Sequence, residues 1–191
     1  MLSRQPLSPS TRAPRAVPRC WLMCDERLGD RILSVIAAMP PCSAVVVRPY
    51  AMQAGHRAAV IRAIRRTARA KRHLLLIAGR GSDAGYDGRH GYGVWRTTGF
   101  LSAAVHDRHE LARAIRCGAD AVLISPVWPT RSHPDSATLD RKGFARLAAA
   151  SSAKAIALGG VTDRRFGQLR IHGAAGWAAI DAWLPRDTHP E

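Results

Sequence analysis

The sequence predicts an α/β protein whose strands form a buried parallel sheet. Short apolar runs recur along the chain, helix-like segments separate them, and each run is apolar at consecutive rather than alternating positions. Consecutive apolar residues are typical of parallel strands that helices cover on both faces. This alternation of strand and helix fits either a doubly wound sheet or a (β/α)8 barrel. The predicted strands are WLMC (21–24), SAVVV (43–47), HLLLIA (73–78), FLSAAV (100–105), AVLIS (121–125), AIALG (155–159) and GWAAI (176–180).

The segments between these runs have the pattern of amphipathic helices. Residues 56–70 place Val60, Ile61, Ile64 and Ala68 on one face and arginines around the other. No G-x-G-x-x-G follows the first predicted strand, so a dinucleotide-binding sheet lacks its usual motif. Further helices are expected over residues 107–117, capped by Asp107 and ended by Gly118, over residues 140–150, and from a cap at Thr162 or Asp163 to Ile171.

Length and composition favour one globular domain with a basic surface. The chain has 191 residues, of which 47% are hydrophobic, and this excludes fibrous and wholly disordered proteins. Its formal net charge is +15, carried mostly by arginine. Arginine also accumulates through GC-rich coding, and arginines opposite an apolar stripe usually form a solvated helix face. Because no nucleic-acid motif accompanies them, we do not expect direct nucleic-acid binding.

The ends of the chain differ from its centre in composition. Residues 1–19 are rich in Pro, Arg and Ser and contain no acid, so we expect a disordered basic tail, a domain over 20–184 and a short tail over 185–191. No apolar run approaches the ~20 residues that span a bilayer, and no secretory signal is recognisable, so a cytoplasmic protein is expected. The cysteines are expected to be reduced thiols rather than metal ligands: Cys20, Cys24, Cys42 and Cys117.

Polar residues follow three of the predicted strands, at the edge where α/β folds collect their ligand groups. These stretches are AVH at 104–106, SPVWPTRSH at 125–133 and LGGVT at 158–162. Together with the GAD turn at 118–120 and the segment HGAAGWAAIDA, they follow one another in a recognisable order over about residues 100–183. This order resembles the thiamine phosphate synthase/TenI family.

The resemblance implies a (β/α)8 TIM barrel that binds thiazole phosphate at its carboxyl-terminal rim. The segment Asp87–Tyr92 stands where the family has its fourth strand. The segments before Asp87 and between Tyr92 and Phe100 are too short for full helices, so the barrel should be trimmed in its third and fourth units.

Several positions that serve the pyrimidine diphosphate and magnesium in the family have changed. Arg48 alone remains of the polar residues after the second strand, and Ala104 replaces a serine. Ala78 and Gly79 stand where the family has magnesium-binding polar residues, which leaves Asp87 as a single candidate carboxylate. Because Mg²⁺ needs several oxygen ligands, no tight metal site is expected. Magnesium would be needed only if synthase activity is retained.

The resemblance assigns the thiazole phosphate to the later strands. The expected phosphate contacts are Gly159, Gly160, Ile180 and Asp181, with Thr130 and Ser132 as hydrogen-bond donors from the preceding loop. Exposed amides suit an anion, whereas the Asp181 carboxylate would repel it unless directed away. We therefore expect a Gly160→Ala substitution to weaken phosphate binding more than it lowers stability.

His106 is the candidate acid/base, because imidazole both removes and returns protons near neutral pH. Its alternative role is to cap the helix that begins at Asp107. If His106 is the acid/base, its ring and the amides of Gly159 and Gly160 should face one pocket.

Three functions stay open at this point. The favoured one is TenI-like tautomerase chemistry on a thiazole phosphate, without a cofactor. The others are a thiamine phosphate synthase that joins pyrimidine diphosphate to thiazole phosphate, and a non-catalytic phosphate-binding or regulatory barrel. In each case the partner is a small molecule rather than a membrane, and homo-oligomerisation is left open.

Overall fold

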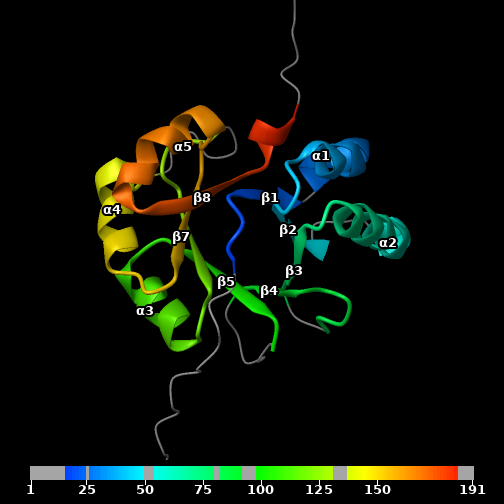
Figure 1. The fold of residues 1–191 in the computed structure, drawn as a ribbon, viewed down its shortest axis with the longest axis horizontal. Helices are drawn as coiled ribbons and strands as arrows, with labels where there is room; N and C mark the ends of the chain where they lie inside the picture. Colours follow the sequence, from blue (N-terminus) through cyan, green and yellow to red (C-terminus); the bar gives the residue numbers. More distant parts are fainter. Residues whose placement is uncertain are drawn as a thin grey trace, which may run out of the picture.

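Eight parallel strands form a closed barrel in the order of the sequence (Figure 1). The computed structural model describes residues 16–24, 26–49, 54–79, 82–91, 98–130 and 137–184. Pairing of β1 with β8, for example Leu22 with Ala179, closes the barrel. The predicted (β/α)8 barrel is therefore confirmed, and the doubly wound sheet is excluded. The strands are β1 (Cys20–Cys24), β2 (Ala44–Val47), β3 (Leu74–Ala78), β4 (Gly88–His90), β5 (Phe100–Val105), β6 (Ala121–Ile124), β7 (Lys154–Leu158) and β8 (Ala174–Ala179).

Alternate residues of these strands fill the barrel interior. Trp21 and Phe100 are the largest side chains there, with ring centroids 6.0 Å apart and ring planes inclined by 53°. The intervening residues, such as Val45 and Val122, are buried in separate clusters with residues of the helices. Both faces of most strands are thus covered, which explains the continuous apolar runs. The short strand β4 carries Arg89 and His90 instead, so hydrophobic patterning alone does not find it.

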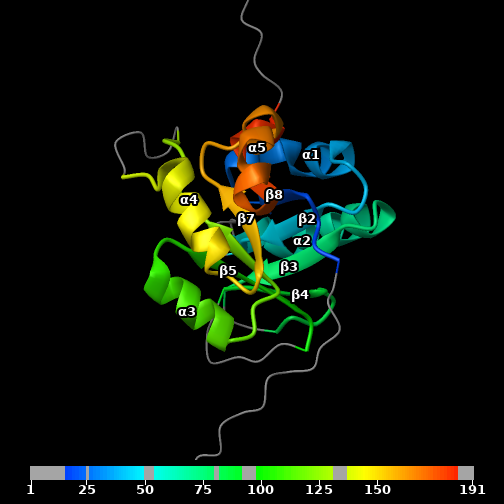
Figure 2. The same ribbon diagram turned by 60° about the vertical axis from the view of Figure 1, so that its left-hand side comes forward.

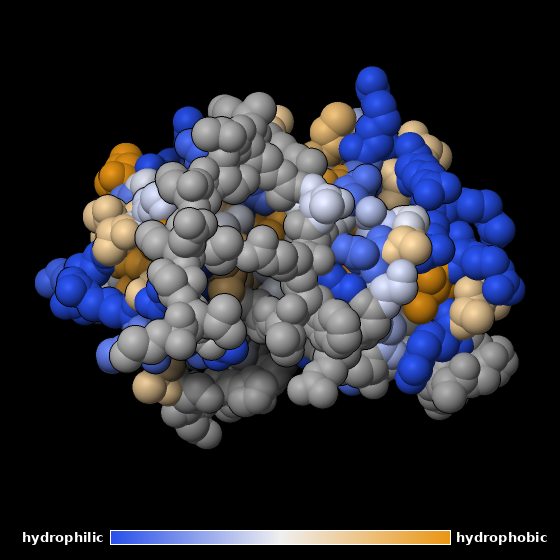
Figure 3. Space-filling model, turned by 90° about the horizontal axis from the view of Figure 1, so that it is seen from below, coloured by the Kyte–Doolittle hydropathy of each residue, from blue (hydrophilic) through white to orange (hydrophobic). Residues whose placement is uncertain are grey.

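Helices cover two sides of the barrel (Figures 1 and 2). α1 and α2 lie on one side, and α3, α4 and α5 lie on the other. Ile64 and Ala68 of α2 are buried against the outer residues of β1, β2 and β3. The side that carries α1 and α2 is mostly hydrophilic (right in Figure 3). The helices are α1 (Ile32–Ala38), α2 (Ala54–Ala70), α3 (Arg108–Arg116), α4 (Asp140–Ala149) and α5 (Asp163–Leu169), with short 3-10 turns at Glu26–Arg31, Arg170–His172 and Asp181–Trp183.

The third and fourth units are trimmed, as expected. Within the described residues no helix follows β3 or β4. The connections are residues 79–87 and 91–99, which leave no room for a helix of usual length together with its turns. Every helix in the described ranges is too short or too polar to cross a membrane.

Residues from both ends of the described chain pack against β1 and β8. The Trp21 indole donates to the carbonyl of Pro18 at 2.6 Å, and the Trp177 amide donates to the carbonyl of Arg19 at 2.8 Å. Trp183 stacks on Trp177, with centroids 4.6 Å apart, and its indole donates to the carbonyl of Trp21 at 3.0 Å. Residues 16–19, which composition placed in the basic tail, therefore contact the barrel. Residues 1–15 and 185–191 lie outside the described residues.

Candidate active site at the carboxyl ends of the strands

His106 directly follows β5 at the carboxyl-terminal rim of the barrel. Its ring Nδ1 lies 2.7 Å from a carboxylate oxygen of Glu110, which also accepts the His106 backbone N–H at 2.7 Å. Asp107 caps α3 by accepting the amide of Glu110 at 2.8 Å. The first turn of α3 thus holds the His106 imidazole through its Nδ1 atom. The side chain is 55% exposed, and its Nε2 bonds to none of the described residues.

The turn after β7 is a second feature of this rim. Gly159 and Gly160 have φ values of 89° and 63°, in the left-handed region that favours glycine. The carbonyls of Leu158 and Gly159 accept the amides of Val127 and Trp128 at 3.0 and 3.1 Å, so the turn is joined to the loop after β6. The amides of both glycines donate to none of the described residues. They are the part of the turn that remains available to an anion.

Gly160→Ala is expected to lower the free energy of unfolding by about 1–3 kcal/mol, the usual cost of a side chain in this backbone conformation. An added Cβ would also lie 2.7 Å from the Pro129 carbonyl oxygen and 2.9 Å from the Trp128 Cβ. The loss of unfolding free energy expected for Gly160→Ala is therefore larger than the sequence alone indicates. Urea unfolding checks this, with Gly167→Ala as the matched control, because a Cβ there meets nothing within 4 Å. Equal stability of the two variants would contradict the prediction.

A polar cluster includes Arg48 after β2, His90 at the end of β4 and Ser102 within β5. The His90 Nδ1 is 3.0 Å from the Ser102 hydroxyl, in a barrel that is otherwise apolar inside. Burial, followed by the positive charge of Arg48, lowers the pKa of His90 to about 4. His90 is therefore neutral at physiological pH. Arg48 was a predicted site residue, whereas Ser102 was missed although it is the one polar residue of its apolar strand.

Three other predicted contact residues lie at the same rim: Thr130, Ile180 and Asp181. Thr130 is partly buried in the loop after β6. Ile180 packs on the top of the interior cluster, and Asp181 begins the last 3-10 turn directly after it. Ser132 lies outside the described residues.

A family model described as thiamine monophosphate synthase matches residues 95–183, which run from before β5 through the last 3-10 turn. The matched segment includes His106, the loop after β6 and the glycine turn. Over residues 95–183, the chain thus matches the thiamine monophosphate synthase family. No curated protein matches the chain in sequence.

Solved structures show the same fold beyond the matched segment. Thiamine phosphate pyrophosphorylase from Pyrococcus furiosus superposes with a TM-score of 0.70 at 20% identity, covering 86% of this chain and 86% of that chain. Thiamine phosphate pyrophosphorylase from Bacteroides thetaiotaomicron gives 0.59 at 13% identity, covering 92% of this chain and 90% of that chain. At these identities the likeness concerns the fold.

Asp87, the candidate metal ligand, lies at the opposite end of the barrel from His106 and the glycine turn. It directly precedes β4, and its carboxylate accepts the amide of Leu75 at the start of β3, at 2.8 Å. Its carbonyl accepts the amide of Phe100. Asp87 therefore orders strand entries and is wrongly placed to ligate a metal at the rim. The described residues contain no group of three or more His, Cys, Asp or Glu side chains that could hold a metal ion.

Asp87→Ala is expected to destabilise the protein by about 1–3 kcal/mol, because the Leu75 amide loses its acceptor. Asp87→Asn should cost less, since its amide oxygen still accepts. Thermal or urea unfolding measures both changes. If both substitutions lowered the free energy of unfolding equally little, the hydrogen bond from the Leu75 amide would not be what Asp87 contributes.

Two cavities among the described residues can be compared with the pocket expected to join His106 with the glycine turn. Those cavities have volumes of about 780 and 420 Å³, and neither is lined by His106, Gly159 or Gly160. The His106 ring is instead held against the first turn of α3. The cap of α3 is Asp107 rather than His106, whose ring contacts the Glu110 side chain through Nδ1 and leaves Nε2 for chemistry.

Proposed function

We propose that this barrel acts on a thiazole phosphate by metal-independent proton transfer of the tautomerase type. The observation that carries the proposal is the contact between His106 Nδ1 and the Glu110 carboxylate at 2.7 Å. A carboxylate at Nδ1 favours the tautomer with its proton on Nδ1. The unprotonated Nε2 then accepts a proton from the substrate and returns it to another ring position.

The glycine turn supports the phosphate part of this proposal. The two free amides of Gly159 and Gly160 lie at the end of β7, where barrels of this type commonly hold phosphate. Backbone amides bind an anion without carrying a competing charge. Asp181 would have to direct its carboxylate away from the bound phosphate.

The synthase reaction has less support from the same residues. Asp87 is engaged at the other end of the barrel, and Ala78 and Gly79 have no side-chain oxygen to offer a metal. The described positions Ala78, Gly79 and Asp87 therefore offer a Mg²⁺-diphosphate substrate no carboxylate at the rim. Arg48, directly after β2, still offers a diphosphate a positive charge at the carboxyl-terminal rim.

A non-catalytic thiazole-phosphate-binding barrel is the second candidate. It is favoured by the 55% exposure of the His106 side chain. In this case the His106–Glu110 pair serves only the start of α3.

One experiment separates the three functions. The protein is incubated with the non-aromatic thiazole carboxylate phosphate tautomer, and its conversion is followed by NMR with EDTA present. The expected result is conversion to the aromatic tautomer above the uncatalysed rate. Product formation only after addition of pyrimidine diphosphate and Mg²⁺ would identify a synthase. Calorimetric binding without conversion in either assay would identify the non-catalytic barrel.

A further inference from the structure

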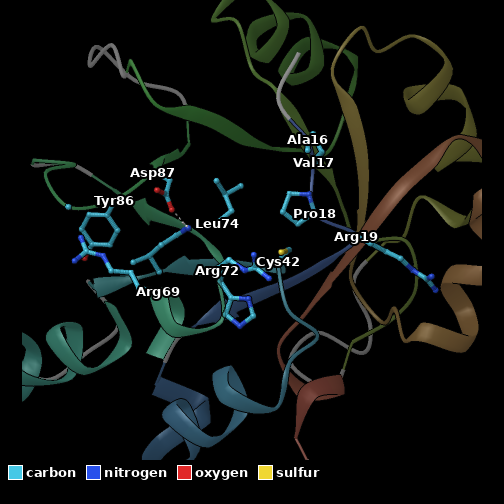
Figure 4. A pocket seen from close by; sticks show the side chains of 13 residues that line it. Ala16, Val17, Pro18, Arg19, Cys42, Arg69, Arg72, Leu74, Tyr86 and Asp87 are labelled. Carbon is cyan, nitrogen blue, oxygen red and sulfur yellow. Dashed lines mark hydrogen bonds between the residues drawn. The ribbon is translucent and has the colours of Figure 1, made fainter. Parts of the chain in front are cut away.

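The cavity of about 780 Å³ lies at the amino ends of β2, β3 and β4, and Figure 4 shows its lining side chains. His106 directly follows the carboxyl end of β5, at the opposite end of the barrel. The cavity wall includes Cys42, Leu74 and Asp87, which precede or begin these strands, Arg69 from the last turn of α2 and Arg72 from the turn after it. Its volume of about 780 Å³ falls within the usual range of small-molecule sites. This cavity plays no part in the function proposed for the rim.

The cavity has an excess of positive charge. The guanidinium groups of Arg69 and Arg72 pair with none of the described residues. Arg19 also borders the cavity, but it forms an ion pair with Asp163 at 3.0 Å and is directed away from the other lining side chains in Figure 4. The acid among the lining residues is Asp87, whose carboxylate already accepts the Leu75 amide.

Helix α2 does not supply the missing negative charge. Its residues 54–70 include no Asp or Glu. Arg65 and Arg66 lie four and three positions before Arg69, and like charges at these spacings repel one another across a helix surface. A bound anion would relieve this repulsion.

Other parts of the wall suit the body of an organic ligand. Val17, Pro18 and Leu74 give an apolar surface. The Tyr86 ring lies under the Arg65 guanidinium, 4.4 Å from centroid to carbon, and burial raises the pKa of its phenol, which stays a hydrogen-bond donor.

His73 contributes shape rather than charge to this cavity. Its Nδ1 accepts the amide of Ser43 at 3.1 Å, and its Nε2 lies 3.0 Å from the carbonyl of Ile36. Burial lowers the pKa of His73. Both nitrogens are thus occupied by the fold, and the anion must be held by the arginines.

We propose that this cavity binds a small organic phosphate, with the phosphate dianion on Arg72 beside Cys42 and the organic group against Val17, Pro18 and Leu74. A guanidinium group binds phosphate through paired hydrogen bonds, and Arg69, directed toward Tyr86 in Figure 4, adds a second positive charge to the cavity. The site is separate from the rim, so its ligand would act on the barrel as an effector.

Cys42 provides a direct test of occupancy, because its exposed thiol lines the cavity. Cys117, also exposed, follows α3 on the other side of the barrel and is the control within the same molecule. The full chain is alkylated with iodoacetamide at low ionic strength, with increasing phenyl phosphate, and each cysteine is quantified by mass spectrometry. Phenyl phosphate should slow alkylation of Cys42 and leave Cys117 unchanged, and phenol should protect neither thiol.

Paired variants test whether the two arginines hold the anion. In Arg69→Gln/Arg72→Gln, the phenyl phosphate concentration that half-protects Cys42 should rise roughly tenfold or more. In Arg62→Gln/Arg108→Gln, which removes the same charge from residues outside the cavity, it should change little. The proposal is overturned if Cys42 is not protected, if phenol protects equally, or if both double variants weaken protection alike. His106→Ala should leave this protection intact even if the proposed rim activity fails.

Discussion

Acidification from pH 7 to pH 4 is expected to lower the free energy of unfolding by about 3 kcal/mol through His90 alone. Burial and the charge of Arg48 lower the pKa of His90 from 6.5 to about 4 in the folded protein. The unfolded chain therefore takes up this proton near pH 6.5, whereas the folded barrel does not until about pH 4. Stability is fully present above the upper value and is lost as the pH falls between the two.

Urea unfolding of the wild type and of His90→Gln across this pH range measures the effect. Glutamine keeps a hydrogen-bonding side chain toward Ser102 and removes the titration, so its stability curve should be flatter by that amount. His73, whose pKa is also lowered by burial, contributes in the same direction in both proteins and cancels in the comparison. Parallel curves would show that His90 does not titrate in the buried position described.

His106→Ala is expected to lower kcat for thiazole tautomerisation by about 10²–10⁴-fold, the usual contribution of a general acid/base. Its affinity for the phosphate substrate should change little, because the proposed phosphate contacts are the amides of the glycine turn. Glu110→Gln should give a smaller loss and alter the pH profile of kcat, since a neutral amide no longer favours the reactive tautomer.

His109→Ala is the matched control for these activity measurements. His109 is an exposed histidine of the same helix. Its removal should leave kcat unchanged. If His106→Ala and His109→Ala both kept full activity, His106 would serve only the start of α3, and the proton transfer would belong to another group.

The fold was predictable from sequence wherever a strand is covered on both faces. Runs such as Ala121–Ile124 are apolar throughout because one side faces the barrel interior and the other faces helices. Strand β4 has no such pattern: Arg89 and His90 occupy two of its three positions, and only the family resemblance locates it. The missing helices around β4 were predictable from chain length, since too few residues connect the strands.

The sequence predicted where the candidate site residues lie in the barrel better than it predicted which residues they contact. The resemblance placed His106 and Gly159 at strand ends, and the structure has them there. The Glu110 contact could have been anticipated from its spacing, because residues four apart meet on a helix turn. Asp87 shows the limit: the family resemblance located its strand, but only the pairing of β3 with β4 reveals that its carboxylate accepts the Leu75 amide.

The most direct test of the proposed rim chemistry is a crystal structure of the protein with the aromatic thiazole carboxylate phosphate bound. The account predicts the phosphate on the amides of Gly159 and Gly160, with the thiazole ring within hydrogen-bonding distance of His106 Nε2. A phosphate bound at the rim with the ring remote from His106 would contradict the proton-transfer role. A ligand bound only at the other end of the barrel would contradict the rim site altogether.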